Sequence, residues 1–311
     1  MTDVFRVDEP GMFTTVQDLG RPNAIAAGVT PGGAMDRFAH SAANLLVGNE
    51  AGAATLECTL VGPRLVALRP ALVAVTGGEL EFRINGRHAP TWTALFVGEG
   101  ANLTFGTRRS GARAYIAISG GVAGDRWLGS LSTYTLISKG GMAGRALTAG
   151  DVVRAAAIGS SPAVSGRTLS PQLRPDYGSH VLRAIPGPHV QRLTPSDRET
   201  FFTATFRVSL DANRMGYRLE GPPLSSTGEE VLSFGVTAGA VQLPAGGRPI
   251  LLMADHQTAG GYPVIAAVAG ASMPVAAQLA PGDELVFREV GLEAALRMRS
   301  EQRSALDSLR N

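Results

Sequence analysis

Four polar residues of different chemistry stand side by side in the stretch MADHQTAGGYP: Asp255, His256, Gln257 and Thr258. The carboxylate could act as a general base or orient the imidazole, which titrates near neutral pH. The hydroxyl and the side-chain amide suit an amide or carboxylate ligand. The pair Gly260-Gly261 follows and lets backbone N–H groups approach a ligand closely. A polar hairpin turn that happens to contain histidine fits the same residues, so the residues alone leave both interpretations open.

Gln242 in AVQLP comes shortly before this stretch and is expected to face the same cleft.

A second candidate is DANRMGYRLEG at residues 211–221, where Asn213 and Arg214 precede a Met-Gly-Tyr step. The planar guanidinium of arginine matches a carboxylate or phosphate. Alternatively, Arg214 pairs with an acid of its own stretch, such as Asp211, on a strand edge.

A third candidate is TTVQDLGRP at residues 14–22, which carries Thr15, Gln17, Asp18 and Arg21 around a Gly-Arg-Pro turn. These side chains could shape a cleft, or they could only cap and close the turn.

A predicted helix over residues 36–47 places Asp36, His40 and Asn44 four residues apart and therefore on one face. That face could bind a polar ligand, but the residues alone favour contact with solvent. Asp36 also suits the N-terminus of the helix as a structural cap.

Composition excludes several classes of protein. Lys139 is the only lysine among 28 basic residues, and it lies in SKGG, so the chain has no P-loop and no Met-Lys-Met biotinylation site. The net charge of +2 gives no case for a nucleic-acid or membrane surface. The five histidines and the lone Cys58 show no metal-ligand spacing, so no metal is predicted. The polar start and the lack of a long apolar run predict a soluble, cytoplasmic protein, with Cys58 a buried, inert thiol.

Short apolar segments between frequent Gly and Pro predict a mostly β chain with few helices. The expected strands are 65–67, 71–76, 80–84, 114–119, 151–155, 181–185, 250–253, 264–269 and 284–288. The expected helices are 36–47, 194–202 and 292–309. Asn85-Gly86 predicts a tight hairpin.

Two short segments of the chain resemble each other. LTAGDVV at residues 147–153 resembles LAPGDELVF at residues 279–287, each a turn ending in Gly-Asp before a strand. A Ser- and Pro-rich stretch over residues 157–179 separates the two copies. We therefore expect an N-terminal half over residues 1–157, a C-terminal half over 180–290 and a final helix over 291–311.

Three stretches, TTVQDLGRP, NRMGYRLEGPPL and ADHQTAGGYP, together resemble the biotin-dependent carboxyltransferase family, also called the allophanate hydrolase subunit 2-like family. That family includes the C-type subunit of 5-oxoprolinase and KipA-type proteins, and the resemblance runs over about residues 11–287. It implies two halves with the character of cyclophilin-like β-barrels. It also implies a subunit that works with a homologous B-type subunit and an A-type subunit on a small amide or lactam.

The resemblance implies ATP bound by the complex, at a site the sequence does not locate, and allows biotin on a separate carrier protein. Other members often have arginine at the position of His256, which favours a ligand contact over proton transfer for this residue. We expect catalysis by Asp255 and Arg214, and substrate binding by Thr15, Gln17, Asp18, Asp36, Asn213, Gln257, Thr258, Gly260, Gly261 and Tyr262.

The expected function is ATP-dependent cleavage of 5-oxo-L-proline to glutamate with partner subunits, or biotin-dependent carboxyl transfer to urea or a similar amide. The alternative is a KipA-type regulator that binds and antagonises a kinase inhibitor. Peptidyl-prolyl isomerase activity follows only from analogy with the cyclophilin fold.

Overall fold

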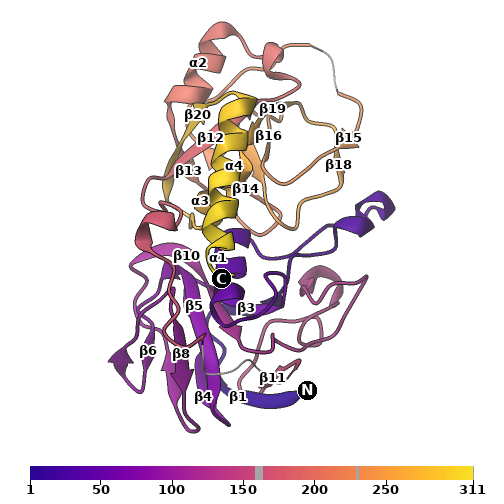
Figure 1. The fold of residues 1–311 in the computed structure, drawn as a ribbon. Coiled ribbons are helices and arrows are strands. Elements are labelled where there is room, and N and C mark those ends of the chain that lie inside the picture. Colours follow the sequence, from indigo (N-terminus) through magenta and orange to yellow (C-terminus); the bar gives the residue numbers. More distant parts are fainter. Residues whose placement is uncertain (158–163, 229–230, 311) are drawn as a thin grey trace. The chain divides into compact units, whose positions relative to one another are not determined.

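The computed structural model describes residues 1–157, 164–228 and 231–310, which fall into two compact units (Figure 1). The first unit holds Met1–Arg21, Gly32–Pro175 and Arg303–Asn311, and the second holds Pro22–Pro31 and Asp176–Gln302. The predicted halves had placed residues 22–31 with the N-terminal part and had treated the last helix separately. Residues 158–163 of the expected linker lie outside the described residues.

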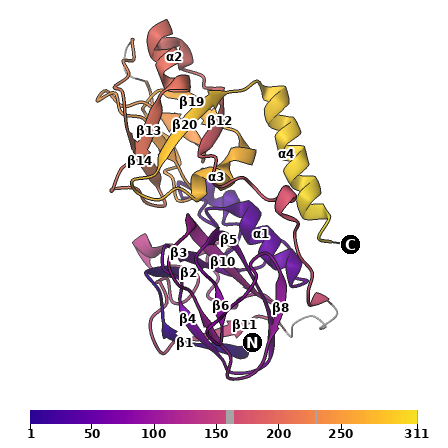
Figure 2. The same ribbon diagram turned by 90° about the vertical axis from the view of Figure 1, so that its left-hand side faces the viewer.

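The first unit is built from two antiparallel sheets. The strands of the six-stranded sheet are, in spatial order, β11 (Val152–Ala155), β1 (Thr2–Glu9), β4 (Arg64–Ala67), β9 (Asn102–Thr104), β6 (Arg83–Ile84) and β7 (Arg87–His88). Those of the five-stranded sheet are β2 (Phe13–Gln17), β3 (Thr55–Thr59), β10 (Ser110–Ile118), β5 (Ala71–Glu79) and β8 (Ala94–Val97). Apolar residues of both sheets, such as Phe5, Leu65 and Ile116, form one buried cluster. Helix α1 (Arg37–Leu46) packs on β5 and β10 (Figure 2).

The second unit is a closed barrel of seven strands. In order around the barrel they are β12 (Val181–Pro186), β19 (Val264–Val268), β16 (Ala240–Gln242), β17 (Ile250–Leu252), β14 (Gly216–Glu220), β13 (Thr205–Val208) and β20 (Glu284–Glu289). Strands β12 and β20 close the barrel in parallel. A small ribbon pairs β15 (Phe234–Gly235) with β18 (Ala259–Gly260). The helices of this part of the chain are α2 (Pro195–Thr203), α3 (Met273–Ala277) and α4 (Leu292–Asp307).

Aromatic side chains fix α2 on the barrel. Phe201 of α2 stacks on Phe287 of β20 with ring centroids 4.6 Å apart, and Phe206 of β13 lies 6.0 Å from the same ring. Short 3₁₀ helices complete the described elements: η1 (Pro22–Ala27), η2 (Thr135–Ile137), η4 (Pro171–Leu173), η5 (Val190–Arg192) and η6 (Gly270–Ser272).

The prediction of a mostly β chain is confirmed, with one closed barrel in the C-terminal part. The three predicted helices correspond to α1, α2 and α4. Asp36 caps α1 by accepting from the Ala39 N–H at 2.9 Å, and Thr194 caps α2 by accepting from the Asp197 N–H at 3.1 Å. Such caps satisfy backbone donors that have no partner in the first turn of a helix, which explains why these boundaries can be read locally.

The hairpin predicted at Asn85-Gly86 joins β6 to β7, with φ of 51° and 76° at its two central residues. Both angles are positive, as this tight hairpin turn requires. The predicted strand 80–84 is wrong over its first part, because only Arg83–Ile84 is a strand and Glu81 adopts a φ of 47°.

The two similar segments, residues 147–153 and 279–287, have the same turn geometry. The Asp151 carboxylate accepts from the Thr148 N–H at 2.8 Å, and the Asp283 carboxylate accepts from the Ala280 N–H at 2.8 Å. The glycine before each aspartate has a φ near 90°: 91° at Gly150 and 90° at Gly282. Each Gly-Asp turn therefore leads into an equivalent final strand, β11 in one unit and β20 in the other.

Within the described residues, no helix has the length and apolar character needed to span a membrane.

Candidate functional site

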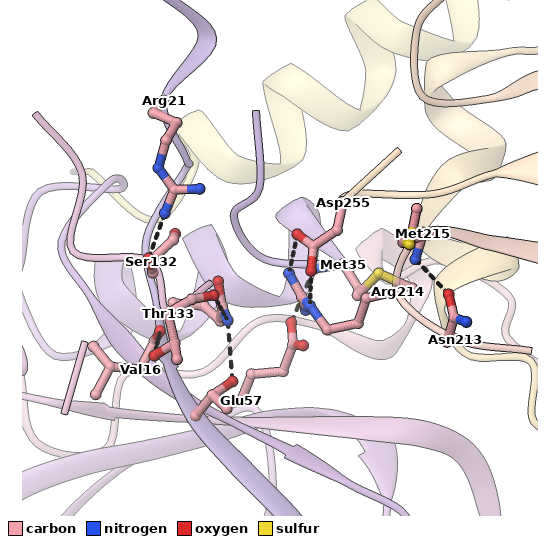
Figure 3. Close-up of polar contacts among 12 residues, drawn as sticks. Val16, Arg21, Met35, Glu57, Ser132, Thr133, Asn213, Arg214, Met215 and Asp255 are labelled. Atoms are coloured by element: carbon pink, nitrogen blue, oxygen red, sulfur yellow. Dashed lines mark hydrogen bonds and ion pairs between the residues drawn. The ribbon is translucent and has the colours of Figure 1, made fainter. Parts of the chain in front are cut away.

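Arg214 and Asp255 of the barrel unit form a mostly buried ion pair (Figure 3). Nε of Arg214 donates to Oδ2 of Asp255 at 2.8 Å, and Nη2 donates to Oδ1 at 3.1 Å. Only 13% of the arginine side chain and 11% of the aspartate side chain are exposed. The two side chains therefore form a bidentate pair that is mostly removed from water, the geometry in which this interaction is strongest.

The backbone around the pair fixes its position. The Asp255 N–H donates to the Arg214 carbonyl at 2.8 Å, and the Met253 N–H donates to the Met215 carbonyl at 3.0 Å. Asn213 closes the turn before β14, because its Oδ1 accepts from the Met215 N–H at 2.8 Å (Figure 3). The sequence offered Arg214 an acid within its own stretch, but its partner lies 41 residues further on.

The ion pair defines what Asp255 can do in this state. Both carboxylate oxygens accept from Arg214, so Asp255 holds the guanidinium in one orientation. Of the two roles considered for this residue, general base and orienter, the geometry supports the orienter. Arg214 then supplies an oriented positive charge that can recognise a carboxylate or a polarised carbonyl.

The rest of the MADHQTAGGYP stretch mixes buried and exposed positions. His256 is 2% exposed and its Nδ1 lies 2.6 Å from the Gln257 carbonyl, an acceptor, so Nδ1 carries the proton. Gln257 and Tyr262 are exposed, whereas Gly260 is buried in the β15–β18 ribbon. The buried imidazole fits the expectation that His256 is not the residue that transfers protons.

Gln242, at the end of β16, is 1% exposed, and its buried Nε2 has no hydrogen-bond partner among the residues that the structure describes. Sequence reasoning indicated Gln242 only as a neighbour of the same cleft. Its burial and its unpartnered amide are the signals that single it out, and both require the barrel.

In the first unit, Asp18 accepts four hydrogen bonds. The donors are the hydroxyls of Ser130 and Ser132, both at 2.6 Å, the Leu131 N–H at 2.6 Å and the Gly20 N–H at 2.8 Å. Burial by itself would raise the pKa of the Asp18 carboxyl, but these hydrogen bonds together lower it below its ordinary value. Three of the donors bind Oδ1 and the Leu131 N–H binds Oδ2, so Asp18 holds the loop at residues 130–132 against the end of β2.

Arg21 and Gln17 extend this cluster. Arg21 is 2% exposed, donates to the Ser132 carbonyl (Figure 3) and lies 5.0 Å from the Trp127 ring centroid, a cation–π contact. Gln17 is 1% exposed and its Nε2 donates to the hydroxyl of Thr15 at 3.0 Å. Its Oε1 is buried with no hydrogen-bond partner among the described residues.

The expectation that Asp36, His40 and Asn44 face solvent is wrong. All three are 0% exposed, because their face of α1 lies on the five-stranded sheet. Their partners come from distant residues: Tyr115 Oη accepts from the Asp36 N–H at 2.7 Å, and Thr55 Oγ1 lies 2.9 Å from His40 Nδ1. Asp36, predicted to bind substrate, is thus the buried N-cap of α1 in this structure.

The buried imidazole of His40 makes the stability of the chain depend on pH. Burial lowers the pKa of His40 to about 4; Asp18 opposes this shift and Arg37 adds to it. Between pH ~6.5 and ~4 the unfolded chain takes up a proton that the folded chain does not. We expect the free energy of unfolding to fall by up to about 3 kcal/mol as pH drops through this window.

Urea unfolding at several pH values tests this expectation. The variant His40→Gln should lose this part of the slope, whereas His88→Gln, at an exposed position, should keep it. Equal slopes in both variants would show that His40 does not cause the effect.

Cys58 is buried and unpaired, and burial raises the pKa of its thiol to about 12, so it stays protonated and inert, as predicted. Among the described residues, no group of three or more His, Cys, Asp or Glu side chains could hold a metal ion.

A groove of about 530 Å³ lies beside α2, and none of the predicted site residues lines it. Its lining residues are Val190, Gln191, Leu193, Pro195, Arg198, Glu199, Phe202, Thr203 and Glu289.

Comparison with known proteins places this geometry in context. The model of the family described as "Carboxyltransferase domain, subdomain A and B" matches residues 27–289. The C-type subunit of the Escherichia coli 5-oxoprolinase is 36% identical over 98% of this chain and 97% of its own length. The urea amidolyase of Lachancea kluyveri is 31% identical over 98% of this chain but only 18% of its own length. The crystal structure of the K. lactis urea amidolyase superimposes with a TM-score of 0.92 at 29% identity, covering 99% of this chain and 20% of that one.

Proposed function

This chain belongs to the carboxyltransferase family, and on that premise we propose that it is the C-type subunit of an ATP-dependent 5-oxoprolinase. The observation that carries the proposal is the reciprocal coverage with the C-type subunit from E. coli, whereas the chain spans only about a fifth of the urea amidolyases. A B-type subunit and an A-type subunit complete the proposed enzyme. The proposed reaction cleaves the lactam amide bond of 5-oxo-L-proline to give glutamate.

The arrangement of the barrel residues supports this chemistry. When an oxygen nucleophile adds to a lactam carbonyl, negative charge develops on the carbonyl oxygen, and oriented donors stabilise that charge. In the proposal, the Arg214 guanidinium is such a donor and Asp255 keeps it in position. ATP is consumed by the assembled complex, and no residue of this chain is assigned to its binding.

A second function in the same family is carboxyl transfer from biotin to urea or a similar amide. The structural similarity to the K. lactis urea amidolyase supports it. Lys139 lies exposed at SKGG rather than between methionines, so biotin would come on a separate carrier. Both reactions act on a carbonyl next to nitrogen, and Arg214 has the same task in each.

Reconstitution tests the proposal. The chain is co-expressed with the B-type and A-type proteins from its own genome and incubated with ATP and 5-oxo-L-proline. We expect glutamate to form only when all three proteins and ATP are present. ATP-dependent carboxylation of urea with a biotinylated carrier would support the second function. A stable complex that turns over neither amide would favour the KipA-type regulator and overturn the enzyme.

The variant Asp255→Ala should abolish the ATP-dependent turnover of the reconstituted complex. It should also lower the Tm of the chain, because it removes this carboxylate from a mostly buried guanidinium, while the complex still assembles. Without the carboxylate, Arg214 loses the partner that orients it. Glutamate release and co-elution on size exclusion provide the two readouts. Normal turnover by an assembled Asp255→Ala complex would remove this pair from the catalytic site.

A further inference from the structure

The burial of the Gln242 side chain should destabilise the fold when no ligand is bound. It is 1% exposed, and its buried Nε2 donates to no acceptor among the residues that the structure describes. A buried amide donor is normally paired, and an exception calls for an explanation such as a ligand. The neighbouring strand pairings, Gln242 with Ile250 and with Val264, are made by its backbone and do not involve the side chain.

Gln242 is not the only amide at this place. A Cβ atom added to Gly260 would lie 2.7 Å from Nε2 of Gln242 and 2.7 Å from Nε2 of Gln257. The two nitrogens therefore lie no further apart than twice that distance. Gln257 is exposed, so one of the two amides is open to solvent while the other lies beneath the surface.

Gly260 permits this arrangement. Its backbone is fixed by pairing with Phe234 in the β15–β18 ribbon, and the absence of a side chain leaves room for both amides beside its Cα. Any larger residue at this position would push the two amides away. The glycine thus has a steric role here, in addition to the backbone freedom expected from its sequence context.

We propose that Gln242 and Gln257 form a paired-amide clamp over Gly260 that binds the amide group of a small lactam or ureido ligand. This inference rests on the proposed function and assigns the residues that recognise its substrate. Two N–H donors converging on one oxygen suit a carbonyl that gains negative charge. A glutamine amide also carries an acceptor oxygen, so the clamp can accept from the N–H group of the same ligand, which a carboxylic acid or ester lacks.

The variant Gln242→Met tests the clamp, because it keeps the length of the side chain and removes the amide. In the reconstituted complex we expect the KM for the amide substrate to rise at least tenfold. The Tm of the variant chain should equal or exceed that of the wild type, because the removed donor has no partner among the described residues of the free protein. Gly260→Ala should raise KM in the same direction, and Gly246→Ala, where an added Cβ meets nothing within 4 Å, is the matched control.

Direct binding separates this inference from the proposed function. The purified chain, labelled with ¹⁵N on glutamine side chains, is titrated with 5-oxo-L-proline and with urea. Shifts of the Gln242 and Gln257 amide signals in the wild type, with the Gln257 shift lost in Gln242→Met, would support the clamp even if the complex shows no turnover. A lower Tm with unchanged KM in Gln242→Met, or no amide shift with either ligand in the wild type, would overturn it.

Discussion

Replacing Arg214 by lysine is expected to lower the turnover of the assembled enzyme about a hundredfold, at the lower end of the loss seen when one oriented oxyanion donor is removed. Lysine keeps the positive charge but lacks the planar fork whose Nε and Nη2 each donate to one oxygen of Asp255. The charge would therefore remain in the barrel without its fixed direction. The measurement is the steady-state rate of glutamate formation by complexes carrying wild-type or variant chains.

A second arginine of the barrel provides the control. Arg207 pairs with Glu284 at 2.9 Å, but about half of each side chain is exposed, at 57% and 58%. Arg207→Lys should change neither turnover nor stability by a measurable amount, because exposed pairs contribute little, typically below about 1 kcal/mol. Equal losses in both variants would mean that turnover responds to replacing any barrel arginine by lysine and not to the orientation of Arg214.

Arg214→Ala should also destabilise the chain, since it leaves the Asp255 carboxylate without its partner in a mostly buried place. For this reason lysine, and not alanine, is the informative substitution for catalysis.

Replacing Asp18 by alanine is expected to lower the free energy of unfolding by about 4 kcal/mol, because it leaves several buried donors without an acceptor. These donors include two hydroxyls and two backbone N–H groups. Urea unfolding at neutral pH measures the effect. Asp3→Ala, at an aspartate whose side chain is 53% exposed in its pair with Arg154, should cost under about 1 kcal/mol.

The acid behaviour of Asp18 gives an independent check. Its pKa lies below the ordinary value, so it contributes stability that is present above pH ~4 and is lost as pH falls through the lower pKa of the folded state. This window lies below the one expected for His40, between about 6.5 and 4. Asp18→Asn should flatten the loss below pH ~4. It also removes the charge that opposes the shift of His40, so the His40 window should extend to lower pH. A steep loss below that pH in Asp18→Asn would assign the acid effect to another carboxylate.

Many local features could be predicted from the sequence because their causes lie within a few residues. Asp36 and Thr194 mark the starts of α1 and α2 through caps made three residues ahead. Asn85-Gly86 predicts a hairpin because few residues tolerate two successive positive φ angles. The motifs at residues 14–22, 213–224 and 254–263 were likewise sufficient to indicate the family.

The roles of individual polar residues depend on which distant segments the sheets bring together. Arg214 and Asp255 meet because β14 pairs with β17, and Asp18 meets Ser130 and Ser132 across more than a hundred residues. Asp36 and His40 were expected on a solvent face, yet they pack on the sheet through partners that no local pattern reveals. Helical spacing shows that two residues share a face, but not what covers that face.

The sequence by itself therefore determined the mostly β architecture, the helix boundaries and the family, since periodicity, caps and turn residues act over short distances. The tertiary structure alone decided that Asp255 orients Arg214, that Asp18 braces a loop and that the Gln242 amide nitrogen is buried without a partner among the described residues. The physical reason is that a hydrogen bond or an ion pair depends on distances of a few ångströms between strands, and strand register, not sequence separation, sets those distances.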